Sequence, residues 1–274
     1  MKHAIMVLGS GSNTKVLQKL IEHFDDKNID FFIHWDKKFS LPSFTSKYSK
    51  IILIPRIRVY WGTSTLVHAE KMLLESVKNN NAHYEWIHLI SSSDIPLMTK
   101  DYFFSFFKEN KKRLYLGFDR DSTQNSFRLM YYYPIAHFNV RKYHYVIKII
   151  KGINRFFHVN RLKNKSITLE KGSEWFSIRS TYIEKILKYP NYEIFDNSFL
   201  ADETYLQTIL AEYKPKVINE EVNCMAARYI DWNRGKPYVF KADDIPELRK
   251  VVNTKYAFAR KVYDEKIITD IFQK

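Results

Sequence analysis

Residues 3–34, HAIMVLGSGSNTKVLQKLIEHFDDKNIDFFIH, decide the fold class of this 274-residue chain. The apolar run at 3–8 predicts one strand and the run at 30–34 predicts another, while residues 13–24 between them have helical spacing. The apolar positions of that helix are Val16, Leu17, Leu20 and Ile21. A strand, a helix and a strand in this order predict a βαβ unit, which joins two parallel strands.

The same alternation continues along the chain. Further strands are predicted at 51–54, 86–90 and 114–118, with helices at 64–77 and 102–108. Later apolar stripes predict helices at 181–187, 202–213 and 245–252. We therefore expect a single α/β domain over residues 1–274, with a Rossmann-like, mainly parallel sheet flanked by helices.

Cysteine content and the distribution of apolar residues predict a cytoplasmic protein. No stretch approaches the roughly 20 consecutive apolar residues of a membrane-spanning helix, and the N-terminal stretch MKHAIMVLGSGS lacks the pattern of a secretory leader. Cys224 is the one cysteine, so neither an intramolecular disulfide nor a cysteine-based zinc site can form. A reducing compartment is therefore expected.

The formal charge of +14 predicts attraction to a polyanion, which can be nucleic acid, an anionic membrane or a diphosphate group. Residues 141–165 contain eight Lys or Arg and no acid, interleaved with apolar and aromatic residues. This segment predicts a basic amphipathic surface that docks on the inner face of the cell membrane, with a solvated basic face as the alternative. An RNA-binding protein is a rival interpretation, because 19 Tyr and 20 Phe can supply stacking surfaces, although no RNA-recognition motif is present.

Polar residues follow three of the predicted strands, at Gly9 to Ser12, His34 to Lys38 and Ser91 to Asp94. Ligands bind beyond the carboxyl ends of parallel strands, so these segments are expected to line a site. The turn at Gly9 lacks the third glycine of a dinucleotide fingerprint because Thr14 stands there, which favours a tight polar turn that can still approach a nucleotide.

Asp119 and Asp121 follow the predicted strand at 114–118. Two carboxylates two residues apart can share Mn²⁺ or Mg²⁺, as many nucleotide-sugar enzymes do with a D-x-D pair. The pattern is very short, however, and Arg120 between the acids fits a solvated turn. The solvated turn is therefore favoured over the metal pair.

Asp202 and Glu203 open the predicted helix at 202–213, where acids commonly complement the helix dipole. Nearby motifs supply Trp175, after a glycine turn at Gly172, and Trp232. Aromatic rings pack on the C–H faces of sugars while carboxylates accept hydrogen bonds from sugar hydroxyls. The composition therefore favours a sugar site over a purely electrostatic role for Glu203.

Arg260 and Lys261 allow two interpretations of equal weight. They can end a helix, where basic side chains bond the last carbonyl groups, or they can clamp a diphosphate with a planar fork and a point charge.

Seven short motifs carry a resemblance across nearly the whole chain. They are IHWDKK (33–38), YWG (60–62) with Ser64, LISSSDIPL (89–97), KGSEWF (171–176), ADETY (201–205) with Thr208, IDW (230–232) and FARK (258–261). In this order they resemble the family of core-2 and I-branching β-1,6-N-acetylglucosaminyltransferases and peptide O-xylosyltransferases.

The resemblance implies a GT-A-type fold, with a nucleotide-binding half at 1–120 and an acceptor-binding and catalytic half at 121–274. It implies an inverting glycosyltransferase that moves a sugar from a UDP-sugar donor to a hydroxyl of a glycan acceptor, with no metal ion or other cofactor required. Glu203 is then the general base. The expected donor-binding residues are Gly9, Asp36, Trp61, Asp94, Arg260 and Lys261, with the last two on the diphosphate. The expected acceptor-binding residues are Gly172, Ser173, Glu174, Trp175 and Trp232.

The chain also departs from the animal members, which have a membrane anchor, disulfides and a further basic residue upstream of the C-terminal motif. Arg234 and Lys236 are both candidates for that residue. The departures suggest a bacterial enzyme of surface polysaccharide synthesis with a glycan or lipid-linked glycan acceptor. GlcNAc, Gal, Glc and Xyl all remain possible donor sugars, since pocket details discriminate them. A carbohydrate-binding protein with a degenerate transfer site is the other alternative.

Overall fold

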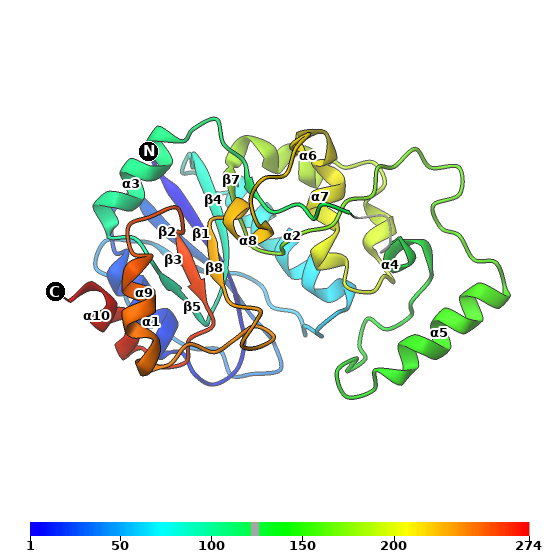
Figure 1. Cartoon of the computed structure of the whole chain (residues 1–274), viewed down its shortest axis with the longest axis horizontal. Helices are drawn as coiled ribbons and strands as arrows, with labels where there is room; N and C mark the ends of the chain where they lie inside the picture. Colours follow the sequence, from blue (N-terminus) through cyan, green and yellow to red (C-terminus); the bar gives the residue numbers. More distant parts are fainter. Residues whose placement is uncertain (122–125, 274) are drawn as a thin grey trace.

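The computed structural model describes residues 1–121 and 126–273 (Figure 1). Its central sheet has six strands in the order β3-β2-β1-β4-β7-β6. Their bounds are β1 (His3–Gly9), β2 (Ile29–Trp35), β3 (Ile51–Leu53), β4 (Trp86–Ser91), β6 (Tyr115–Leu116) and β7 (Phe176–Arg179). The first four strands are parallel, whereas β7 runs antiparallel to both of its neighbours. The prediction of a mainly parallel α/β sheet is therefore confirmed.

Ten α-helices lie in the described residues, and several of them cover the two faces of this sheet. The longer ones are α1 (Lys15–His23), α2 (Ser64–Lys78), α3 (Lys100–Glu109) and α5 (Tyr145–Phe156). The shorter ones are α4 (Phe127–Met130), α6 (Ile183–Leu187), α7 (Tyr205–Ile209), α8 (Val222–Met225), α9 (Ile245–Lys250) and α10 (Lys266–Phe272). Figure 1 shows α5 and α10 at opposite ends of the long axis of the molecule. Within the described ranges, no helix has both the length and the apolar content needed to cross a bilayer.

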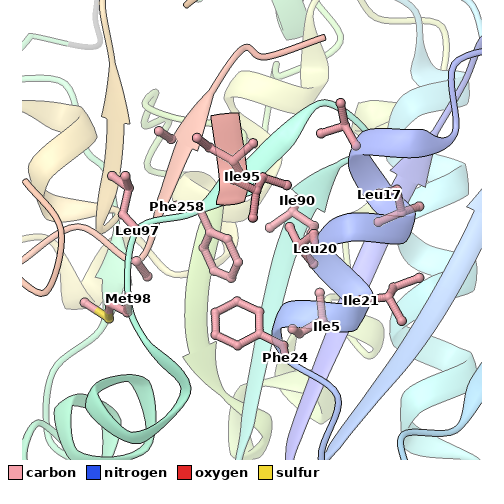
Figure 2. Close-up of a cluster of buried hydrophobic side chains, with 14 of the residues drawn as sticks. Ile5, Leu17, Leu20, Ile21, Phe24, Ile90, Ile95, Leu97, Met98 and Phe258 are labelled. Atoms are coloured by element: carbon pink, nitrogen blue, oxygen red, sulfur yellow. The ribbon is translucent and has the colours of Figure 1, made fainter. Parts of the chain in front are cut away.

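Alternating side chains of β1 enter two separate cores. Ile5 and Val7 pack with helices α1, α3 and α10, and Figure 2 shows Ile5 beside Leu20, Ile21 and Phe24. Ala4 and Met6 face the other side, where helices α2, α6 and α7 contribute the buried residues. Because both faces of the strand are buried, its sequence is apolar at almost every position.

A second, three-stranded sheet was not predicted. It pairs β5 (Asp94–Pro96) with β9 (Phe258–Arg260), and β9 with β8 (Arg228–Ile230). Strands of three residues are too short to give a periodic signal. The helix-end interpretation of Arg260 is therefore wrong, because this residue ends a strand that is paired on both sides.

The helix predicted at 202–213 is divided into three short pieces. Glu203 ends a 3₁₀ turn, η4 (Ala201–Glu203), and the α-helix begins only at Tyr205. Between them the Thr204 hydroxyl donates a hydrogen bond of 3.0 Å to the carbonyl oxygen of Ala201, which competes with regular helical bonding. The backbone of Thr204 is outside the helical region.

Candidate active site

The carboxyl ends of β1, β2 and β4 lie side by side. Gly9 is in register with Trp35, and Leu8 is in register with Ser91. The amide of Asp36 donates a hydrogen bond of 2.9 Å to the carbonyl oxygen of Gly9. The three polar segments predicted to share one edge of the sheet therefore do share it.

Gly9 allows close packing at this edge. A Cβ atom at this position would lie 2.1 Å from Cε3 of the buried Trp35 ring, so a side chain would displace the indole. The glycine thus has a packing role, and its contact with a donor stays a prediction.

Asp36 is buried and organises the turn that follows β2. Its Oδ1 accepts hydrogen bonds from the amides of Lys38 (3.0 Å) and Val59 (3.2 Å), and its Oδ2 lies 3.3 Å from Nζ of Lys38. The preceding His34 accepts a bond of 3.0 Å from the Ile57 amide through Nε2. Burial lowers the pKa of His34 to about 4, so its imidazole is neutral and can accept this bond. Asp36 and His34 together hold the loop at 57–59 against the sheet edge.

Trp61 projects from the same loop and is 44% exposed. The guanidinium carbon of Arg141 lies 4.6 Å from its ring centroid. The carbonyl oxygen of the next residue, Gly62, accepts a 2.9 Å hydrogen bond from the amide of Leu200. The loop that carries Trp61 is therefore bonded to the segment that leads into Glu203.

Asp94 and Arg260 face each other across the second sheet as a buried pair. Nε of Arg260 lies 3.5 Å from Oδ1 of Asp94, which also accepts a 2.7 Å bond from the Ser91 hydroxyl. The guanidinium carbon of Arg260 lies 3.7 Å from the ring centroid of Trp175. Among the described residues, Nε and Nη1 of Arg260 are buried and have no hydrogen-bond partner. This desolvated cation has N–H groups that a bound anion can satisfy.

Lys261 is half-buried beside this pair. Its pKa is lowered by burial and then by the neighbouring Arg260 and by Arg141, while Asp94 and Glu174 oppose the change. The basic residues of the C-terminal motif therefore share one electrostatic neighbourhood with Arg141, Asp94 and Glu174. An anion placed there would be attracted to three cations.

Glu203 lies in a short chain of ion pairs. Its Oε2 accepts a bond of 2.6 Å from Nη1 of Arg128 and lies 3.6 Å from Nζ of Lys171. Lys171 also contacts Oδ2 of Asp119 at 2.7 Å. The Glu203 side chain remains 34% exposed. In the described part of the chain both ionic contacts of Glu203 are made by Oε2, so Oε1 is the oxygen available to a hydroxyl group.

Glu203 belongs to a larger carboxyl cluster with Glu70, Glu174 and Asp202. Burial raises the pKa of Glu174 to about 7; Arg260 opposes this rise and Glu203 adds to it. Burial, Glu174 and Glu203 also raise the pKa of Asp202 well above its ordinary value. Burial is the main cause of the raised pKa of Glu70, which accepts a hydrogen bond from the Tyr205 hydroxyl. Carboxyl groups of this kind can donate as well as accept hydrogen bonds near neutral pH.

The raised pKa of Glu174 predicts a pH-dependent stability. Between pH 4.5, its ordinary value, and about 7, the folded state binds a proton that the unfolded state releases. This group therefore lowers the free energy of unfolding as pH rises through that window, by up to about 1.4 kcal/mol per pH unit. Glu174→Gln removes this dependence. In urea denaturation, the free energy of unfolding of the variant relative to wild type should therefore be higher at about pH 8 than at pH 4.5. A stability difference independent of pH would contradict the assignment.

The KGSEWF segment (171–176) contacts both Gly117, which follows β6, and Glu203. A Cβ atom at Gly172 would lie 1.8 Å from the carbonyl oxygen of Gly117, and the Gly172 amide donates a 2.9 Å bond to the carbonyl oxygen of Glu203. Buried Gln207 donates to the carbonyl oxygens of Gly117 (3.1 Å) and Ser173 (2.7 Å). The predicted residues Gly172, Ser173 and Glu174 are thereby held close to Glu203.

Trp232 is less closely connected to these groups. It is 55% exposed, and its Nε1 lies 3.5 Å from Oδ1 of Asn223. It lies two residues after Ile230, which is in register with Arg260.

Arg234 forms ion pairs with Asp231, Asp244 and Glu247. Three carboxylates already neutralise Arg234, which leaves Lys236 as the better candidate for the additional basic residue.

The Asp119 carboxylate is engaged by Lys171, as described above, and Asp121 immediately precedes 122–125, which lie outside the described residues. Over 1–121 and 126–273, no group of three or more His, Cys, Asp or Glu side chains is arranged to hold a metal ion. Because a lysine ammonium already occupies one side of Asp119, a cation bound there would meet electrostatic repulsion.

The sequence patterns did not identify two residues of this site. Arg128 belongs to none of the seven motifs, although it lies in a stretch of polar and aromatic residues that contains no acid between Asp121 and Glu170. Gln207 lies among the apolar residues Leu206, Ile209 and Leu210 of a predicted helix. A polar amide side chain among these apolar residues was the one sign of a role in the site. The surface also has two hollows, one lined by residues that include Glu184 and Ile209 and the other lined by residues that include Lys112 and Met225. None of the predicted site residues lines either hollow.

Two comparisons relate the chain to known proteins. The sequence model of the Core-2/I-Branching enzyme family matches residues 4–250. The chain is also similar to xylosyltransferase oxt of Drosophila melanogaster, with 20% identity over 294 residues. That alignment covers 94% of this chain and 31% of the fly protein, so the chain spans about a third of that relative. The extent of the family match shows that the chain belongs to the Core-2/I-branching enzyme family.

Proposed function

We propose that the chain is an inverting glycosyltransferase with a GT-A-type fold, which transfers a sugar from a UDP-sugar to a hydroxyl of a glycan. One observation carries this proposal: a partly exposed carboxylate, Glu203, and a buried cation, Arg260, act on the same carboxyl group, Glu174, and among the described residues Nε and Nη1 of Arg260 have no hydrogen-bond partner. Both residues influence the pKa of Glu174. Family membership and the similarity to a xylosyltransferase support the same conclusion.

The chemistry assigned to Glu203 is general base catalysis. A free hydroxyl is too weakly acidic to attack at neutral pH, so a carboxylate removes its proton as the new bond forms. The acceptor oxygen bonds to the anomeric carbon, the bond from that carbon to the diphosphate breaks, and UDP leaves with the electron pair. The proton passes to Oε1 of Glu203, while Arg128 holds Oε2.

Arg260 and Lys261 are assigned to the departing diphosphate. Negative charge grows on this group as the bond breaks, and fixed cations in a desolvated site stabilise such charge effectively. Trp175 and Asp94 hold the guanidinium of Arg260 in place by stacking and ion pairing. We therefore propose that these residues replace the metal ion of other nucleotide-sugar enzymes.

Glu174 is the other carboxyl that this site offers as a base. Its pKa of about 7 means that about half of the population is protonated at neutral pH. Arg260 and Lys261, which we assign to the diphosphate, both oppose the rise in the pKa of Glu174, whereas Glu203 adds to it. We assign Glu174 to hydrogen bonds with hydroxyls of the transferred sugar, and Glu203, with its exposed side chain, to the incoming acceptor.

The remaining assignments concern the ligands. We propose that Asp36, Trp61 and Asp94 lie at the nucleotide and that Trp232 packs on the acceptor sugar. A role in bacterial surface polysaccharide synthesis at the inner membrane face follows from the same proposal, with a glycan or lipid-linked glycan as the acceptor.

Hydrolysis of UDP-sugars tests this function without knowledge of the acceptor. We expect UDP-GlcNAc, UDP-Gal, UDP-Glc or UDP-xylose to raise the melting temperature and to be hydrolysed slowly to UDP in excess EDTA. Binding of none of the four would contradict the transferase assignment. Complete loss of hydrolysis in EDTA with recovery in Mn²⁺ would instead assign Asp119 and Asp121 to a metal ion.

A further inference from the structure

Helix α5 exposes a continuous apolar stripe. The stripe consists of residues that are between 52% and 76% exposed, namely Tyr145, Ile149, Ile153, Phe156 and Phe157. At 100° per residue these positions fall within one sector of about 120° on the helix surface. We call this set the α5 stripe. Its side chains leave a large apolar area in contact with water, which marks a binding surface.

The opposite face of α5 is fixed to the protein. Ile147 is buried in a small core with Tyr133, Ile135 and Val140. The buried Asn154 side chain donates a 3.0 Å bond to the carbonyl oxygen of Tyr132 and accepts a 2.8 Å bond from its amide. These contacts set the rotation of the helix, so the stripe cannot turn inward. Figure 1 shows α5 at the end of the molecule far from the central sheet.

Basic residues border the stripe. Lys148 and Arg155 are exposed, and their positions lie about 60–80° from Tyr145 on the side of the helix away from Ile153. Lys142 is exposed just before the helix. No acid occurs between 141 and 165. The surface is therefore complementary to a partner that offers negative charge beside an apolar region.

We propose that the α5 stripe docks the protein on a membrane surface that contains anionic lipids. Side chains of the stripe would enter the boundary between headgroups and acyl chains, while Lys148 and Arg155 contact lipid phosphates. A polynucleotide fits less well, because the aliphatic Ile149 and Ile153 at the centre of the stripe have no π face on which a base can stack.

The docking helix is connected to the candidate active site. Arg141, four residues before α5, stacks on Trp61 and influences the pKa of Lys261. Phe127, whose ring lies 3.4 Å from Nζ of Lys151 on α5, precedes Arg128, the partner of Glu203. Docking through α5 would thus hold the site close to the lipid surface.

Vesicle co-sedimentation tests the proposal on the full chain. We expect wild type to bind vesicles of equal parts phosphatidylcholine and phosphatidylglycerol at least tenfold more tightly than pure phosphatidylcholine vesicles at low salt. Lys148→Gln with Arg155→Gln should weaken binding about thirtyfold, since each basic residue near an anionic surface contributes about fivefold. Ile149→Ser with Ile153→Ser should weaken it at least tenfold. Circular dichroism and UDP-sugar hydrolysis should be unchanged in the Ile149→Ser, Ile153→Ser variant, which separates docking from folding and from catalysis.

Three results would overturn the proposal. The first is wild-type protein that stays in the supernatant with anionic vesicles at low salt. The second is an Ile149→Ser, Ile153→Ser variant that sediments as well as wild type, which would assign the attraction to charge alone. A change in oligomeric state of that variant on size-exclusion chromatography, without loss of vesicle binding, would assign the stripe to a second copy of the chain.

Discussion

Glu203→Gln is expected to lower the rate of UDP-sugar hydrolysis by about 10²- to 10⁴-fold, the usual contribution of a general base. Glutamine has nearly the same shape and can still accept the hydrogen bond from Arg128, but it cannot take a proton from the attacking oxygen. The donor side of the site is unchanged, so the affinity for UDP should stay close to that of wild type. Steady-state hydrolysis and isothermal titration with UDP measure the two effects separately.

Glu75→Gln is the matched control. Glu75 is exposed on α2 and has no part in the site, so this variant should hydrolyse UDP-sugars at the wild-type rate. Wild-type turnover by Glu203→Gln would show that Glu203 is not the base, and Glu174 would then be the next carboxyl to test. Loss of UDP binding together with turnover would show that Glu203 supports the donor pocket instead.

Lys261→Met should cause the second largest loss. Methionine keeps the unbranched apolar stem and removes the ammonium group, and a hydrogen bond to a charged group contributes about 1.5–3 kcal/mol. Because Lys261 is partly desolvated, as its lowered pKa indicates, we expect kcat/KM to fall by about 10- to 150-fold. The loss should appear in both UDP affinity and turnover, since the diphosphate is bound before and during bond cleavage.

Lys250→Met controls for the change in net charge. Lys250 is exposed at the end of α9, and its replacement should leave kcat/KM unchanged. Equal losses in the two variants would mean that Lys261 acts through the overall positive field of the protein. Replacement of Arg260 is less informative, because the loss of a buried partner of Asp94 would also destabilise the fold.

The parallel part of the central sheet could be predicted from sequence largely because β1, β2 and β4 are buried on both faces. Strand β1 is apolar from Ala4 to Leu8, and the helix after it repeats its apolar residues at Val16, Leu17, Leu20 and Ile21, all of which are buried. The second sheet escaped prediction because each of its strands has three residues. Its formation depends on pairing between residues more than 160 positions apart, such as Asp94 with Arg260, which no local pattern encodes.

The candidate site likewise has a part that could be predicted from sequence and a part that could not. The edge at Gly9, Asp36 and Ser91 could be expected, because each residue follows or ends a predicted strand and parallel strands bring their carboxyl ends together. Glu203 was expected in the first turn of an α-helix, whereas the hydroxyl of Thr204 interrupts that helix. Arg128 reaches Glu203 from 75 residues away, and only the folded chain reveals this ion pair.

The anomeric form of the first sugar released from a UDP-sugar tests the central claim most directly. In a single displacement assisted by Glu203, water attacks the face opposite the departing diphosphate, so an α-linked donor gives a β-sugar. Proton NMR recorded before the sugar equilibrates in solution should therefore show the β-anomer first. Initial release of the α-anomer would contradict the account, because it requires a second displacement or attack from the same face.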